Sequence, residues 1–386
     1  MEKDLRFVLS LAKFISAHNR FPGSFHHLEV REFLKEALKE FGNVKTQTFE
    51  TTLLKPVEGI VERGSIPIKG FPYTNSPSKE VSGEIVYVGY GLPADISYKD
   101  LRGKIVLVKE GKLPFRKKEK FFAKKGAKGV IVFKEDIEDI YAGVSAGLLP
   151  VVAINPSEAR FLHTGDRVLL RAKTERKQVK GENIWLDIGS GESTLYLIAH
   201  YDTKPNTPGA IDNGLSVSLL VWLIGKLSTT KRDWDYKIRF LFTDLEEYGL
   251  QGAERFVAQL PQEEIERSIA VSVDTVGWRN PAILVSDGEG MNSISLLKLC
   301  SDMLEEMNRR HYVTFTDGKS GRSDHIPFRK RGAKTLFFAS NPFPYRHTSL
   351  DSFEAIDFYV VLFWMKFLNL FVKNINPELF GKNKKS

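Results

Sequence analysis

TLYLIAHYD, residues 194–202, joins an apolar run of strand length to a histidine and an aspartate. An uninterrupted apolar run bounded by turn residues is typical of a buried strand. The loop that follows contains Pro205, Pro208 and Gly209, which favour turns and interrupt regular structure. We therefore predict a buried strand that carries His200 at its carboxyl end.

Two further apolar runs lead into acidic residues. IRFLFT at 238–243 is followed by DLEE, and IAVSV at 269–273 is followed directly by Asp274. Apolar residues at helical spacing occupy 215–227 and 291–307, so strands and helices alternate. This alternation predicts an α/β fold with a mostly parallel central sheet flanked by helices. Open sheets of this kind bind ligands at the carboxyl ends of their strands, where these polar side chains would lie.

Candidate metal ligands occur in chain order at His200, Asp212, Glu247, Asp274 and His347. Zinc and similar ions bind imidazole and carboxylate ligands, and a catalytic site keeps one position open for water or substrate. Two ions can share one carboxylate. Asp212 best suits that bridging role, because a short loop returns it to the same sheet edge just before the predicted helix. The pattern predicts a two-metal hydrolase with zinc, and cobalt and manganese accept the same ligands.

The two adjacent glutamates need different roles. We assign Glu247 to metal binding and Glu246 to proton transfer as general base, because a carboxylate free of metal can carry a proton to the leaving amine. Asp202 lies two residues beyond His200. A ligating imidazole usually donates its other N–H to a carboxylate or a carbonyl, so we predict that Asp202 orients His200. Glu246 and Asp202 are therefore the candidate catalytic residues beside the ligands.

Several strings in the sequence resemble the M28 family of zinc aminopeptidases and carboxypeptidases. They are AHYD at 199–202, GAIDNG at 209–214, EEYGLQG at 246–252, SDH at 323–325, YRHT at 345–348 with Asp351, and the opening segment RFPGS at 20–24. The resemblance implies a zinc-dependent exopeptidase fold and a pair of zinc ions. One ion would be held by His200 and Asp274 and the other by Glu247 and His347, with Asp212 shared.

Two positions depart from the family pattern. Arg346 places a bulky cation beside His347, where it either lines the substrate pocket or faces solvent. Ser320 lies near where some members have a tyrosine that stabilises the tetrahedral intermediate, so oxyanion stabilisation would rest on the metals or on another donor. We expect Asp324 and His325 to brace the site without touching metal.

Residues 53–178 resemble the protease-associated (PA) domain that several M28 members carry as an insertion. The elements expected here are strands at 81–91, 101–108 and 129–133 and a helix at 121–128. We predict a β-rich α/β domain inserted into a discontinuous metallopeptidase domain of residues 1–52 and 179–386. No clustered metal ligands occur in the insertion, so we expect it to act as a lid, in substrate access or in assembly.

The remaining composition argues against several other classes. One cysteine, Cys300, excludes an intramolecular disulfide framework. The N-terminal apolar stretch is broken by Lys13 and has no small-residue cleavage pattern, so we expect a cytoplasmic location. The apolar run 358–371 is too short for a membrane span and should pack as a helix on the sheet. The net charge of +8 favours attraction to acidic partners but identifies none. The basic runs at 116–118 and 124–125 are more typical of a solvated helix face than of a nucleic-acid site, so we expect no nucleic-acid partner.

We therefore expect a metallo-aminopeptidase in which a metal-bound hydroxide attacks the N-terminal peptide bond of a peptide substrate. A carboxypeptidase or an aminoacyl-amide hydrolase could use the same site. A single-zinc glutaminyl cyclase is a weaker alternative, because His200 and Asp274 supply a second metal position. An inactive peptide-binding or receptor-like module would be expected to lack ligands, and none is missing. The sequence leaves the oligomeric state open, a homo-oligomer included.

Overall fold

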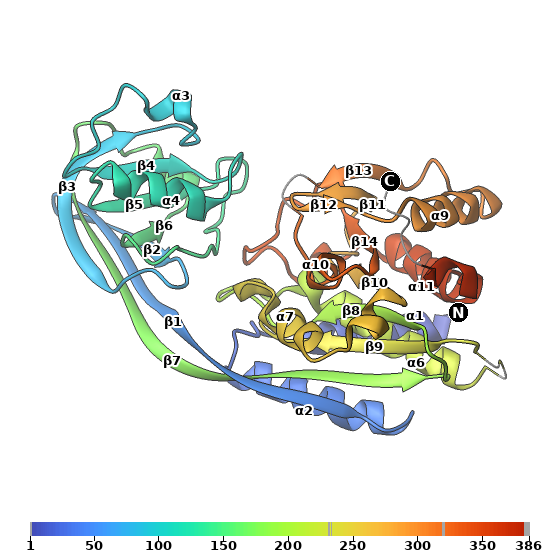
Figure 1. Cartoon of the computed structure of the whole chain (residues 1–386). Coiled ribbons are helices and arrows are strands. Elements are labelled where there is room, and N and C mark those ends of the chain that lie inside the picture. The colour runs from blue at the N-terminus through green and yellow to red at the C-terminus, as the bar shows by residue number, and fades with distance from the viewer. Residues whose placement is uncertain (1, 231, 233, 319–320, 382–386) are drawn as a thin grey trace.

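The computed structural model describes residues 2–230, 232, 234–318 and 321–381. Two lobes of unequal size are joined by a long antiparallel ribbon (Figure 1). The ribbon consists of β1, Lys45–Arg63, and β7, Arg167–Ile188. Strand β7 also pairs with β9 in the larger lobe and with β3 in the smaller one. The domain boundaries expected near residues 52 and 178 fall inside these two strands and stay a prediction.

The larger lobe has a central sheet whose middle strands run parallel. In spatial order they are β9, β8, β10 and β14, which span Lys237–Thr243, Thr194–His200, Ser268–Val273 and Lys334–Ser340. Every residue of β8 and β10 is buried, as their uninterrupted apolar runs predict. At the edge of this sheet, β11, Pro281–Asp287, pairs antiparallel with β14. Two further strands pair with β11: β12, Gly290–Met291, and β13, Thr314–Gly318. The predicted mostly parallel sheet is confirmed.

Helices cover both faces of this sheet. Along β8, Leu195 and Leu197 join one hydrophobic layer, while Tyr196 and Ile198 join the other. The first layer contains α1, α2, α6, α9 and α11, which span Glu2–Ile15, Phe25–Lys39, Leu215–Ser228, Ile294–Glu306 and Phe358–Asn374. The second contains α7, α8 and α10, which span Gln251–Ala258, Gln262–Glu266 and His325–Lys330. Short turns η1 to η4 span Ala210–Gly214, Glu246–Tyr248, Phe353–Ala355 and Pro377–Phe380.

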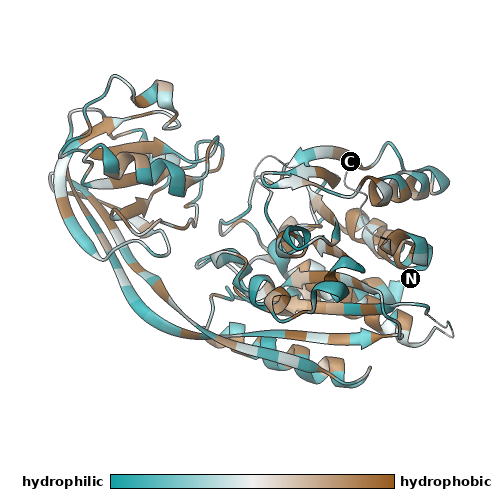
Figure 2. Ribbon diagram, viewed as in Figure 1, coloured by the Kyte–Doolittle hydropathy of each residue, from teal (hydrophilic) through white to brown (hydrophobic). Residues whose placement is uncertain are grey.

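The helices expected at 215–227, 291–307 and 358–371 are present, and the second begins only at Ile294. Within the described part of the chain, one helical stretch, Ala210–Ser228, is long and apolar enough to cross a membrane. Because 89% of it is buried inside the molecule, it fits the core helix of the larger lobe. In Figure 2, hydrophobic residues concentrate in the central strands of the larger lobe, while the ribbon of β1 and β7 is mixed.

The smaller lobe is a β-rich α/β unit. Its strands β2 to β6 span Ile66–Pro72, Lys79–Tyr87, Ile105–Lys109, Gly129–Phe133 and Val151–Ala153. Its helices α3, α4 and α5 span Pro93–Ile96, Phe115–Lys124 and Pro156–Ala159. Strands β3 to β6 run parallel, and a hydrophobic cluster packs on each face of their sheet. The strands expected at 81–91, 101–108 and 129–133 are present as β3, β4 and β5, but β3 ends at Tyr87 and β4 begins only at Ile105.

The helix expected at 121–128 is wrong in position. Helix α4 begins at Phe115 and ends at Lys124. Pro114 precedes its first turn, where a fixed φ is tolerated because no backbone donor is needed. Gly126, with a φ of 81°, takes the left-handed conformation that commonly follows a helix end. Ala127, in the part of the expected helix beyond 124, belongs to the approach to β5 and not to the helix.

Candidate metal centre

The five side chains predicted as ligands converge at the carboxyl edge of the parallel strands. His200 ends β8, and Asp274 directly follows the neighbouring strand β10. Asp212 lies in η1 before α6, and Glu247 lies in η2 after β9. His347 lies in the loop after β14. Residues far apart in the chain thus meet because parallel strands deliver their carboxyl ends to one edge.

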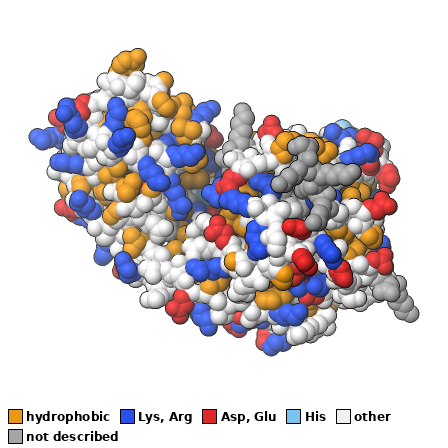
Figure 3. Space-filling view, in the orientation of Figure 1, with side chains coloured by type: hydrophobic (Ala, Val, Ile, Leu, Met, Phe, Trp, Pro, Cys, Tyr) orange, Lys and Arg blue, Asp and Glu red, His pale blue; other side chains and the backbone are white. Residues whose placement is uncertain are grey.

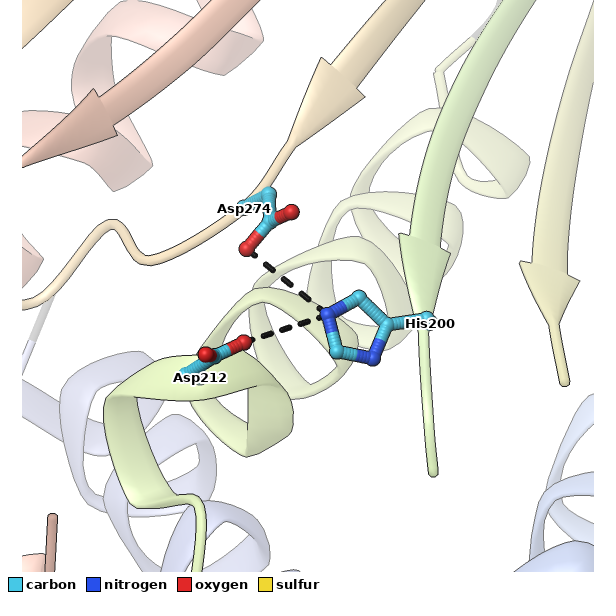
Figure 4. A group of neighbouring side chains, drawn as sticks. All are labelled: His200, Asp212 and Asp274. Carbon is cyan, nitrogen blue, oxygen red and sulfur yellow. Dashed lines mark ion pairs between the residues drawn. The ribbon is translucent and has the colours of Figure 1, made fainter. Parts of the chain in front are cut away.

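His200, Asp212 and Asp274 form what we call the first ligand group (Figure 4). Nε2 of His200 lies 3.2 Å from Oδ1 of Asp212 and 3.7 Å from Oδ1 of Asp274. All three residues are buried. Figure 4 shows the imidazole at the end of β8 with one ring nitrogen directed at both carboxylates.

Asp212, Glu247 and His347 form the second ligand group. Nε2 of His347 lies 3.3 Å from Oδ2 of Asp212 and 3.0 Å from Oε2 of Glu247. Asp212 therefore presents one carboxylate oxygen to each group, which is the arrangement expected of a bridging ligand. The structure brings all five side chains together, while their binding of metal stays a prediction.

Two buried atoms without partners show what these groups lack. Nε2 of His200 and Oε1 of Glu247 are buried and have no hydrogen-bond partner among the residues that the structure describes. Buried polar atoms are nearly always paired, and carboxylates crowded in a buried site repel one another unless a cation neutralises them. A divalent cation in each group would satisfy these atoms, and zinc accepts this set of imidazole and carboxylate donors. The residues present therefore fit metal ions.

Asp202 contacts Glu246, Glu247 and His200. Its carboxylate accepts hydrogen bonds from the backbone N–H groups of Glu246 at 3.0 Å and Glu247 at 3.2 Å. Nδ1 of His200 lies 3.1 Å from the backbone carbonyl of Asp202 and 3.6 Å from its carboxylate. The expected contact with His200 is present, with the carbonyl as the nearer acceptor. Nδ1 then carries the proton, which leaves Nε2 free to face the ligand group.

The adjacent glutamates differ in acidity although both are buried. Burial raises the pKa of Glu246 well above its usual range, and the charges of Glu247 and Asp274 act in the same direction. Burial would also raise the pKa of Glu247, but His347 and Lys204 outweigh it and hold this pKa at about 2. Glu247 therefore stays a carboxylate at neutral pH, whereas Glu246 is able to accept a proton.

Residues without a predicted role fix the position of the ligands. Asp351 accepts hydrogen bonds from the backbone N–H groups of Ile211 at 2.8 Å and Asp212 at 3.1 Å. Oγ of Ser323 donates to Oδ2 of Asp274 at 2.7 Å. Both residues belong to the M28-like strings, but spacing alone does not show which atoms they reach.

Two buried cations, Arg20 and Lys204, hold the loop between β8 and η1 in place. The guanidinium of Arg20 donates to the backbone carbonyls of Tyr201 at 2.7 Å and Gly209 at 2.9 Å, so the N-terminal segment pins both ends of this loop. Nζ of Lys204 lies 3.0 Å from Oε2 of Glu247 and also donates to the backbone carbonyl of that residue. Sequence reasoning assigned no role to Lys204, because a lysine within a loop is usually solvated.

Asp324 and His325 are buried behind the ligand groups. Asp324 accepts a hydrogen bond from Thr243, the last residue of β9. Nε2 of His325 lies 2.9 Å from the carboxylate of Asp287, which also binds the guanidinium of Arg329 through both oxygens. These contacts tie α10 to β9 and β11, which is the bracing role expected for the pair.

Arg346 and Ser320 were the departures from the family pattern. Arg346 is half-buried. Burial would lower the pKa of its guanidinium, but Tyr141 and the carboxylates of Asp212 and Glu247 raise it. Arg346 is therefore part of the surroundings of the second ligand group. Ser320 lies outside the described residues, so its relation to oxyanion stabilisation stays a prediction.

The fold and the site together define a class of protein. It is a two-lobed α/β protein with two ligand groups that share a carboxylate at the carboxyl edge of a mostly parallel sheet. Residues 183–364 match the model of Peptidase family M28, and residues 81–161 match that of the PA domain. The larger lobe therefore contains a region that matches peptidase family M28, and the smaller lobe contains a region that matches the PA domain, as the sequence strings predicted.

Characterised proteins agree with this assignment. Aminopeptidase YwaD of Bacillus subtilis (strain 168) is 27% identical over 300 residues, which cover 73% of this chain and 65% of YwaD. This chain thus spans slightly less than two thirds of that relative. The structure of an aminopeptidase from Aneurinibacillus sp. strain AM-1 has a TM-score of 0.73 and 25% identity, covering 95% of this chain and 93% of its own. BSAP, a zinc aminopeptidase from Bacillus subtilis, shares the fold with a TM-score of 0.77 and 22% identity, covering 99% and 96% of the two chains.

Proposed function

We propose that this protein is a zinc-dependent aminopeptidase that hydrolyses the N-terminal peptide bond of its substrate. The observation that carries the proposal is the pair of ligand groups that share Asp212 beside the buried carboxyl of Glu246. The relatives support it, because YwaD and the Aneurinibacillus protein are named aminopeptidases and BSAP is named a zinc aminopeptidase. A peptide substrate is also what the match to a peptidase family supports.

Two zinc ions are the proposed cofactors. His200, Asp212 and Asp274 would hold one ion, and Asp212, Glu247 and His347 would hold the other. Bound zinc supplies Lewis-acid chemistry, which polarises a substrate carbonyl and makes water a nucleophile at neutral pH. Cobalt and manganese would suit the same ligands. The complete first group favours this function over a single-zinc glutaminyl cyclase.

Glu246 is the proposed general base. Its carboxylate takes a proton from the attacking water and delivers it to the leaving amine, while a C–O bond forms and the C–N bond breaks. Asp202 positions this carboxylate by accepting the backbone N–H of Glu246 at 3.0 Å.

Hydrolysis of matched peptides tests the proposal. The substrates are a free leucyl peptide, its N-acetylated form, its C-terminally amidated form and leucinamide, each with and without a chelator. An aminopeptidase cleaves the free and amidated peptides and loses the N-acetylated one. A carboxypeptidase instead loses the amidated peptide, and an aminoacyl-amide hydrolase cleaves leucinamide alone. Chelator-resistant cleavage, or no cleavage of any substrate, would contradict the proposal, and the latter would favour an inactive binding module.

The cellular context of this activity stays a prediction. The N-terminal sequence led us to expect a cytoplasmic protein, and a homo-oligomer is open. Cell fractionation and light scattering on the purified protein would measure these two properties directly.

A further inference from the structure

A segment of the smaller lobe, residues 134–142, contacts the loop that carries His347. Nζ of Lys134 donates to the backbone carbonyl of Pro344 at 2.6 Å. The carboxylate of Asp139 accepts from the backbone N–H of Ser349 at 2.6 Å and from its hydroxyl at 2.7 Å. The loop is therefore held from the smaller lobe on both sides of His347. Figure 3 shows the two lobes facing each other across a groove along which Lys and Arg side chains gather.

Tyr141 lies at the centre of these contacts. Its hydroxyl is 3.0 Å from Nδ1 of His347, and the two rings are 5.5 Å apart with an interplanar angle of 45°. Tyr141 is itself held, because Nζ of Lys134 lies 5.3 Å from its ring centre and the ring of Tyr73 packs 6.3 Å away. Two neighbours from its own lobe thus hold the ring that carries the hydroxyl.

The contact fixes which nitrogen of His347 is free. Nε2 faces Asp212 and Glu247 at 3.3 and 3.0 Å, and an imidazole nitrogen that ligates a metal carries no proton. The proton then resides on Nδ1, which donates it to the hydroxyl oxygen of Tyr141. His200 has the equivalent contact within the larger lobe, where Nδ1 lies 3.1 Å from the carbonyl of Asp202.

The backbone of His347 needs the same support. Its φ is 62°, in the left-handed region that residues other than glycine seldom adopt. The backbone N–H of Ala142 donates to the carbonyl of His347 at 2.8 Å. Consecutive residues of the smaller lobe therefore hold both the strained backbone and the ring of one candidate ligand.

We propose that Tyr141 is a positioning residue that fixes the ring of His347, so that the inserted domain completes the second ligand group. The inference rests on the proposed metal site and extends it, because it makes the affinity for one of the two ions depend on the smaller lobe. The first ligand group takes no part in this contact and keeps its own support from Asp202.

Equilibrium titration of the metal-free protein with zinc, against a competing chelator of known affinity, tests the proposal. Partners that orient a ligating histidine commonly change metal affinity by about 10- to 100-fold. We expect Tyr141→Phe to weaken binding of the second ion by about that factor and to leave the first unchanged. Titration with cobalt, followed by its visible absorption, gives a second readout that is independent of turnover.

Tyr90→Phe is the matched control. It also removes one tyrosine hydroxyl from the smaller lobe, where Tyr90 donates to the exposed carboxylate of Glu135 at 3.2 Å. We expect both ion affinities and hydrolysis to match the wild type. Asp139→Asn loosens the loop without touching the ring, so it should weaken the second ion less than Tyr141→Phe does.

Three results would overturn the inference. Tyr141→Phe could bind both ions as the wild type does, it could weaken both equally, or Asp139→Asn could have the same effect. In each of these cases the wild type still binds two ions and the proposed function stands. A wild type that binds no ion would remove the proposed function and this inference together, so the two failures are distinguishable.

Discussion

The two ligand groups are built differently although they share Asp212. The first joins side chains at the ends of neighbouring parallel strands, and its supports, Asp202 and Ser323, belong to the larger lobe. The second takes both of its other ligands from turns and loops. Its support comes from Lys204 in a loop, from Asp202, which accepts the backbone N–H of Glu247, and from Tyr141 in the smaller lobe.

Exposure follows the same division. The side chain of His200 is 1% exposed and that of His347 is 13% exposed. A ligand fixed by a buried strand end is held by the packing of the whole sheet, whereas a ligand on a loop needs dedicated contacts. The comparison teaches that the first group is part of the core of the fold and the second is where the inserted domain can act on the site.

Loss of the shared ligand should have the largest effect. Asp212→Asn removes a negative charge from both groups, so we expect binding of both ions to fail and hydrolysis to be abolished. Elemental analysis and peptide hydrolysis measure the two losses. If only one ion were lost, Asp212 would belong to one group and the division proposed here would need revision.

Loss of the general base should separate chemistry from metal binding. Glu246→Gln keeps the shape of the side chain but cannot take a proton, so we expect kcat to fall about 100- to 10,000-fold while both ions remain bound. Steady-state kinetics and metal analysis of one preparation provide the comparison. Full activity in this variant would show that another group moves the proton.

Loss of a residue that supports the first ligand group should weaken binding of the first ion alone. Ser323→Ala removes the hydroxyl that donates to Asp274 at 2.7 Å, so we expect this ion to bind about tenfold more weakly. Under the same titration, Tyr141→Phe should give the opposite selectivity. Equal effects of both variants on both ions would mean that the groups are not supported independently.

The smallest effect on the site is expected from loss of the buried carboxylate of Asp287, which contacts His325 and Arg329. Burial would raise the pKa of Asp287, but His325 and Arg329 lower it below its usual value of 3.8. The stabilisation is therefore fully present above that ordinary pKa and is lost as the pH falls below it. We expect Asp287→Asn to lower the free energy of unfolding by about 3 kcal/mol at neutral pH, with little change in hydrolysis.

Denaturant unfolding between neutral pH and pH 3 measures this prediction. The variant should lose less stability than the wild type on acidification, since it lacks the carboxylate that becomes protonated. Equal acid sensitivity of the two proteins would show that Asp287 does not contribute in this way.

The sequence allowed prediction of the features set by strand ends. Apolar runs that stop at His200 and Asp274 place both residues at one sheet edge, because the parallel pairing of β8 and β10 requires it. The contact of Tyr141 with His347 could not be predicted in this way. It joins loops of two lobes, and no periodicity relates residues 206 positions apart.

Local sequence patterns gave a wrong or an incomplete prediction at two further places. The helix expected at 121–128 lies at 115–124, because Pro114 and Gly126 decide its ends more strongly than the spacing of apolar residues does. The position of Asp202 predicted its contact with His200, but not that its carboxylate would engage the backbone of both glutamates. That contact depends on the tertiary path of two loops.

The number of ions bound to the wild-type protein tests the central claim most directly. We predict two zinc ions per chain at saturation, one for each ligand group, with hydrolysis of free-amine peptides lost on chelation and restored by zinc. Full turnover with one ion per chain, or with none, would contradict the account.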